Sequence, residues 1–248
     1  SLSSKNLKNF LNKKTSQPKS SIKELNCYIG FLGFQLLCEN IKIKLPKQQS
    51  INFYPGLFYK PQTIIKIRKN IIIKSLLKDF KQQYLMRSNT NYFYEKKFNL
   101  NLDESQYSNL FRHFSKKIKL GETYQIKICQ TYQNKSNIDA VQFFWKLMSI
   151  NESPESFLIR DKDYSIISCS PETLIQKKKD AVKTKPIAGT LNRTKRMTAK
   201  FANNFFKKNE KESKEHNMIV DMERNDLSRI CKTGSVKINK LKSVEEYR

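Results

Sequence analysis

The chain has 248 residues, and 38% of them are hydrophobic, which suffices for a real core in one large domain or two small ones. No run of about 18 apolar residues occurs and the first residues are polar, so neither a membrane span nor a secretion signal is expected. The five cysteines form no CxxC pair and only two histidines accompany them, which argues against a zinc site or a disulfide framework. We therefore expect a folded cytoplasmic protein.

The formal net charge of +26 permits a nucleic-acid-binding function, because clustered basic side chains attract phosphate. The lysines are instead spread over nearly the whole chain, alongside abundant Asn and Ile, as a bias toward AT-rich codons would produce. Steering of a small anionic substrate is then the more natural use of the charge. A basic nucleic-acid-binding protein remains the alternative of another class.

The first 20 residues are rich in Lys, Ser and Asn and are expected to be a loop or disordered. Residues 27–41 are mostly apolar and contain Gly30 and Gly33, which predicts a buried strand with a bend or a close backbone approach. Residues 56–77 are rich in β-branched side chains and predict two strands joined near residues 68–70.

Asp103 is a predicted N-cap for a helix that ends at Gly121. The helix carries one apolar stripe, formed by Tyr107, Phe111, Phe114 and Ile118. His113 lies beside that stripe and is interpreted as a surface or satisfied core histidine rather than a ligand. Residues 123–133 alternate between apolar and polar side chains and predict a half-buried strand.

A second amphipathic helix is predicted by the apolar spacing of Ile138, Val141, Trp145 and Met148, a stripe interpreted as core. Residues 156–170 follow as a predicted hairpin that turns at residues 161–163. The sequence SPETL then places Glu172 just past a strand end, and another strand is predicted over residues 181–185.

Residues 186–190, PIAGT, form a predicted turn whose backbone N–H groups and Thr190 hydroxyl could hold an anionic oxygen. Ordinary loops use the same residues, so the turn alone does not establish a site. Within residues 210–236 one helix is predicted, and it stops at Gly234. Its spacing brings Glu212, Glu215 and His216 to one side, although Lys/Glu alternation is also typical of an exposed helix.

Read in order, SPETL, TKPIAGT, KESKEHNMIVDMERNDLSR and TGSVKI resemble the chorismate-utilising enzymes, the family that includes anthranilate synthase component I and aminodeoxychorismate synthase component I. GETYQIKICQ and NESPESF extend the resemblance upstream. It implies an α+β fold with large antiparallel sheets packed together and helices outside. Residues 21–248 would then be a partial chorismate-binding catalytic domain.

The resemblance also implies a Mg²⁺-dependent reaction in which ammonia from a glutamine amidotransferase subunit adds to the ring of chorismate. Transferred by position, Glu215 is a metal ligand, Glu212 its neighbour in the metal site, and Glu172 a catalytic carboxylate. Ala188, Gly189 and Thr190 lie at the substrate by the same comparison.

Two positions separate the branches of the family. Relatives that add water carry a lysine base where this chain has Gln125, so ammonia is the expected nucleophile. Many aminodeoxychorismate synthases carry a lysine that can attack the ring where this chain has Ala188. Gln125, a catalytic position by this comparison, thus favours amination in either branch, whereas Ala188 favours anthranilate synthase, with release of pyruvate. Some aminodeoxychorismate synthases resemble the alanine form, so that enzyme remains the alternative.

The resemblance also implies family elements that would follow Arg248, among them a second metal-binding glutamate. We therefore expect a chain truncated at both ends, with half a site and no activity by itself. Pro154 is followed by Glu155 and Ser156 where tryptophan-inhibited relatives have Tyr and Met, which argues against a regulatory tryptophan pocket.

Overall fold

The computed structural model describes residues 20–44, 54–78, 93–192 and 198–246, together with Asn9, Phe80 and Thr194. The chain divides into two compact units, Ser1–Thr90 and Asn91–Arg248. The loop expected over residues 1–20 lies almost wholly outside the described residues. None of the helices in the described part of the chain is both long and apolar enough to cross a membrane.

The first unit pairs strand β1, Ile29–Leu32, with β2, Gly56–Tyr59, in antiparallel register. Gly30 is needed there, because an added Cβ would lie 1.9 Å from the Leu57 carbonyl oxygen. The predicted close backbone approach is thus confirmed. The single strand expected over residues 27–41 is wrong beyond Leu32, since helix α2, Phe34–Asn40, follows and buries Leu36 and Cys38.

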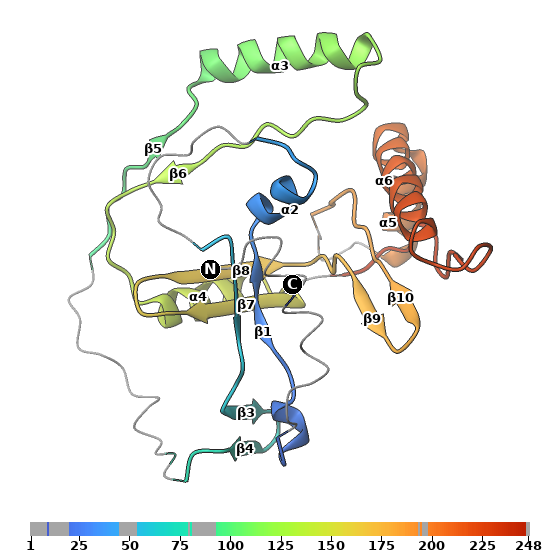
Figure 1. Ribbon diagram of the computed structural model, residues 1–248. Coiled ribbons are helices and arrows are strands. Elements are labelled where there is room, and N and C mark those ends of the chain that lie inside the picture. Colours follow the sequence, from blue (N-terminus) through green and yellow to red (C-terminus); the bar gives the residue numbers. More distant parts are fainter. Residues whose placement is uncertain are drawn as a thin grey trace. The chain divides into compact units, whose positions relative to one another are not determined.

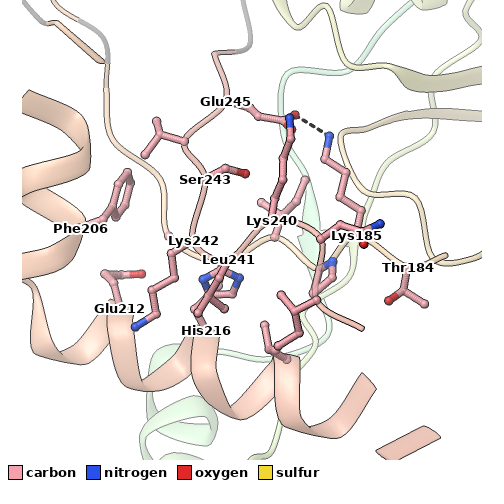
Figure 2. A pocket seen from close by; sticks show the side chains of 18 of the residues that line it. Thr184, Lys185, Phe206, Glu212, His216, Lys240, Leu241, Lys242, Ser243 and Glu245 are labelled. Atoms are coloured by element: carbon pink, nitrogen blue, oxygen red, sulfur yellow. Dashed lines mark hydrogen bonds and ion pairs between the residues drawn. The ribbon is translucent and has the colours of Figure 1, made fainter. Parts of the chain in front are cut away.

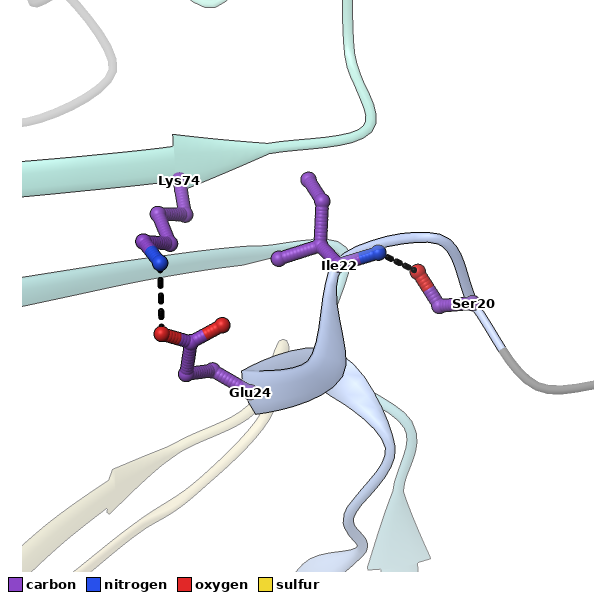
Figure 3. Close-up of polar contacts among 4 residues, drawn as sticks. All are labelled: Ser20, Ile22, Glu24 and Lys74. Atoms are coloured by element: carbon purple, nitrogen blue, oxygen red, sulfur yellow. Dashed lines mark hydrogen bonds and ion pairs between the residues drawn. The ribbon is translucent and has the colours of Figure 1, made fainter.

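A hairpin of β3, Thr63–Ile67, and β4, Ile71–Ser75, turns at residues 68–70 as predicted. The short 3-10 helix η2, Lys23–Leu25, packs against β3 and buries Leu25. An ion pair of 2.5 Å between Glu24 and Lys74 joins this helix to β4 (Figure 3). The hydrogen bond from Lys74 lowers the pKa of the Glu24 carboxyl.

The second unit begins with β5, Asn99–Leu100, and the predicted helix α3, Glu104–Lys119 (Figure 1). Asp103 and Gln106 form a capping box at its start, and Gly121 follows its end with a left-handed φ of 75°. His113 is exposed, as one of its two interpretations required. The strand predicted over residues 123–133 is wrong except for β6, Tyr132–Gln133, which pairs with β5.

Helix α4, Ala140–Ile150, starts at the N-cap Asp139 and packs against a hairpin of β7, Glu155–Arg160, and β8, Ser165–Ser170. This hairpin turns at residues 161–163, as predicted. Trp145 is 62% exposed, so its interpretation as core is wrong. The next hairpin pairs β9, Gln176–Lys178, with β10, Ala181–Lys183, which confirms the strand predicted before PIAGT.

Two helices close the described chain. Helix α5, Ala199–Lys208, was not predicted, and α6, Glu210–Ser228, ends well before Gly234. The single residue Asn209 is the C-cap of α5 and the N-cap of α6, and its side chain accepts from the Glu212 amide at 3.2 Å. The two helices pack against each other, which fixes the start of α6 relative to α5.

The architecture combines helices with small antiparallel sheets and is consistent with the α+β class. In the described ranges the strands form five two-stranded sheets, so the large packed sheets implied by the resemblance are not confirmed.

The first prediction concerns Gly30. The Gly30→Ala substitution should break the β1–β2 pairing and cost about 3 kcal/mol, the upper end for overpacking, because the clash is with backbone. Hydrogen exchange of the β1 and β2 amides, with a thermal melt, measures this. Ile29→Ala is the control, since Ile29 is 55% exposed on the same strand. Equal protection in both variants would contradict the close approach.

Candidate functional site

A cavity of about 750 Å³ lies within the second unit, among the segment from β10 to the PIAGT turn, helices α5 and α6, and residues 236–246 (Figure 2). Its volume is in the range of small-molecule sites. Seven Lys and Arg residues line it against four Glu residues, so its walls carry net positive charge and favour an anionic ligand.

The PIAGT turn contributes Ala188, Gly189 and Thr190 to the cavity wall, so the structure brings these three predicted residues together. Gly189 has a φ of 79°, in the left-handed region that favours glycine. A Cβ at this position would lie 2.8 Å from the Phe206 ring and 2.9 Å from Glu212 Oε2. The turn therefore lies directly against the Glu212 carboxylate.

Glu172 also contacts the same turn. Its Oε1 accepts a hydrogen bond of 3.2 Å from the Ile187 amide, which links the SPETL segment to PIAGT. Glu172 itself is exposed and does not line the cavity, although the adjacent Pro171 does. The structure thus places the predicted catalytic carboxylate next to the turn.

Helix α6 faces the cavity with residues three or four apart, namely Glu212, His216, Val220, Glu223 and Leu227. Glu215 is half-buried on the same helix but does not line the cavity, since it lies at the edge of that face. In the described part of the chain, no group of three or more His, Cys, Asp or Glu could hold a metal ion. Glu212 and Glu215 alone provide two carboxylates one helical turn apart.

Gln125 is not brought to this cavity. It lies in an irregular segment before β6, where its backbone carbonyl accepts a hydrogen bond from the Thr123 hydroxyl at 3.3 Å. Its predicted catalytic position therefore has no support from the geometry of the described residues.

The segment 236–246 adds two lysine contacts that the sequence did not reveal. Lys242 Nζ donates to Ser213 Oγ at 2.7 Å, and Lys185 forms an ion pair of 2.5 Å with Glu245 (Figure 2). The two residues of each contact are far apart in the sequence, so no helical or strand periodicity could have predicted either contact.

Glu223 was not selected as a site residue from the sequence. It nevertheless lies on the same helical face as Glu212, which the spacing of three and four residues shows. Its Oε2 atom is buried and has no hydrogen-bond partner in the parts of the chain described. It lies eleven residues beyond Glu212, about 16 Å along the helix axis, too far to share one metal ion with it. Arg224, its neighbour, forms an exposed ion pair with Asp221 at 3.3 Å on the same helix.

His216 has a pKa below its ordinary value. Burial disfavours the imidazolium form, and the positive charge of Lys242 adds to the effect. A neutral imidazole therefore faces the cavity near neutral pH.

The family of chorismate binding enzymes matches residues 2–248. The chain belongs to this family. It is similar to aminodeoxychorismate synthase component 1 of Bacillus subtilis, at 34% identity over 58% of the chain and 31% of the relative. An anthranilate synthase component I-like protein of Synechocystis is 27% identical over 89% of the chain and 48% of the relative.

Anthranilate synthase component 1 1 of Halobacterium salinarum is 33% identical over 58% of the chain and 28% of its own length. The chain thus spans at most about half the length of these curated relatives. Both kinds of synthase occur at nearly equal identity, so identity does not distinguish the two branches.

The second prediction concerns His216. Its lowered pKa means that the folded protein binds fewer protons here than the unfolded chain does. The contribution of this residue to stability is therefore intact above pH 6.5, its ordinary pKa, and declines as the pH falls toward the folded pKa. Lys242→Met should raise the pKa of His216 only part of the way, because burial remains.

NMR titration of the imidazole in a His113→Gln background checks this, since that background leaves one histidine signal. Lys232→Met, which removes an exposed lysine outside the cavity lining, is the control and should leave the pKa unchanged. A His216 pKa at or above 6.5 would contradict the burial effect.

Proposed function

We propose that this chorismate-binding protein is the aminating component of an anthranilate synthase. The substrates would be chorismate and ammonia, the latter supplied by a glutamine amidotransferase subunit, and the products anthranilate and pyruvate. The contact between Glu212 and Gly189 carries the proposal, because it joins a helix carboxylate to the turn expected to hold the substrate.

Magnesium fits the donor set. Mg²⁺ is bound by one or two carboxylates together with waters and substrate oxygens, and Glu212 and Glu215 provide two such carboxylates. When bound, the ion would polarise a substrate oxygen and stabilise developing negative charge. Glu212 would hold it beside the PIAGT turn, and Glu215, one helical turn further along α6, would supply the second carboxylate.

The remaining roles fall to the turn and to Glu172. The backbone N–H groups of PIAGT and the Thr190 hydroxyl would orient the anionic substrate. Glu172, which accepts from the Ile187 amide, would transfer a proton to the ring hydroxyl as it departs. Ammonia would add to the ring as that hydroxyl leaves as water, and elimination of the enolpyruvyl group as pyruvate would then give the aromatic anthranilate.

Ala188 favours the anthranilate branch, and Gln125 favours ammonia over water as the nucleophile in either branch. Alanine at position 188 cannot attack the ring, and glutamine at position 125 cannot act as a lysine base toward water. The similarity to aminodeoxychorismate synthases supports the second candidate, in which the aminated ring keeps its enolpyruvyl group and pyruvate is not released.

The third prediction is the reaction itself. The complete protein, assayed with chorismate, ammonium and Mg²⁺, should release pyruvate and form a fluorescent anthranilate product. Aminodeoxychorismate without pyruvate would move the protein to the second candidate. No consumption of chorismate under these conditions, with an active anthranilate synthase as positive control, would overturn the proposal.

The fourth prediction concerns the metal site. Glu215→Gln and Glu212→Gln should each reduce Mg²⁺-dependent turnover by more than about 100-fold, beyond the 10–100-fold typical of residues outside the ligand shell. Mg²⁺ should also no longer raise the melting temperature of either variant. Glu210→Gln is the matched control, since Glu210 begins the same helix and pairs with Lys214 in solvent. Full Mg²⁺-dependent activity in Glu215→Gln would refute the assignment.

A further inference from the structure

Lys242 stands out among the residues around the cavity because of its backbone. Its φ is 52°, in the left-handed region that side-chain-bearing residues rarely adopt. Such conformations persist where the surrounding structure holds them, and they cluster at functional sites. The residue lines the same cavity as Glu212 and Gly189.

The Lys242 side chain reaches toward α6, near Glu212 and His216 (Figure 2). Its ammonium donates to Ser213 Oγ at 2.7 Å, and Ser213 directly follows Glu212. A hydroxyl orients an ammonium but does not neutralise it. None of the ion pairs formed among the described residues includes Lys242, and an ammonium has two further donors.

The segment that carries Lys242 is anchored a second time. Glu245, three residues further on, pairs with Lys185 immediately before the PIAGT turn. The segment is therefore tied to α6 through Ser213 and to the turn through Lys185. These contacts hold the Lys242 charge at one place in the cavity wall.

We propose that Lys242 is a further substrate-binding residue, whose ammonium binds a carboxylate of the substrate, and that Ser213 is the positioning residue that aims it. The inference rests on the proposed function in one respect, the identity of the ligand as chorismate, a ring that carries two carboxylates. The cavity's excess of basic side chains supports an anionic ligand in any case.

The fifth prediction tests this by equilibrium binding of chorismate, without ammonium so that no amination occurs. Lys242→Met should raise the Kd about tenfold, the usual weight of a hydrogen bond to a charged group, and the loss should shrink at high salt. Lys242→Arg should keep most of the affinity. Ser213→Ala should weaken binding less than Lys242→Met, because the charge remains but is no longer aimed.

Binding of Mg²⁺ alone separates a binding role from a structural one. Removal of a positive charge near Glu212 should leave the Mg²⁺ affinity of Lys242→Met unchanged or raise it, whereas a distorted site would weaken both ligands. Lys232→Met, which has the same change in net charge outside the cavity, should match the wild type for both ligands.

Equal chorismate affinity in Lys242→Met and Lys232→Met overturns the inference and leaves the proposed function standing. If the wild type does not bind chorismate, the proposed function fails and phthalate, a simple ring dicarboxylate, becomes the probe. Phthalate binding that depends on Lys242 supports the inference without chorismate. Phthalate binding independent of Lys242, or no phthalate binding, overturns it.

Discussion

The lack of space between Gly189 and Glu212 is the constraint on which the candidate site depends. A carboxylate oxygen and an aromatic ring occupy the positions into which any side chain at residue 189 would project. The turn can approach α6 so closely only because its backbone is left-handed and bare at this residue. Glu172 holds the same turn through the Ile187 amide, so the turn has a second restraint two residues before Gly189.

The elements predicted correctly are those whose signals are local. Asp103 caps α3 with its own neighbours, and the hairpins turn at residues 68–70 and 161–163 because polar residues interrupt two apolar runs there. The failures have non-local causes. Residues 34–40 look apolar enough for a strand, yet they form a helix that buries Leu36 and Cys38.

Residues 123–131 show why alternation alone does not make a strand. A strand exists only through a paired neighbour, and in the described ranges just Tyr132–Gln133 finds one, in β5. Helix α5 was missed for a related reason. Its sequence contains several Lys and Asn residues that obscure the apolar periodicity. The packing of Phe206 against Gly189 is known only from the structure.

The candidate site was predictable where residues share an element or a family motif. Gly189 lies against Glu212, Thr190 lines the same cavity, and Glu172 lies at the turn. The Lys242–Ser213 and Lys185–Glu245 contacts span 29 and 60 residues, and no sequence period connects such positions. Glu223 lay within reach of the helical period, but its burial became apparent only in three dimensions.

The junction at Asn209 has a mechanical consequence for the site. One residue ends α5 and begins α6, and its side chain holds the amide of Glu212, so there is no slack between the two helices. A rotation of α5 would therefore turn Phe206 and the Glu212 carboxylate together about the Gly189 backbone. The shared cap and the packing of the two helices thus make their position relative to the PIAGT turn a property of the pair rather than of either helix.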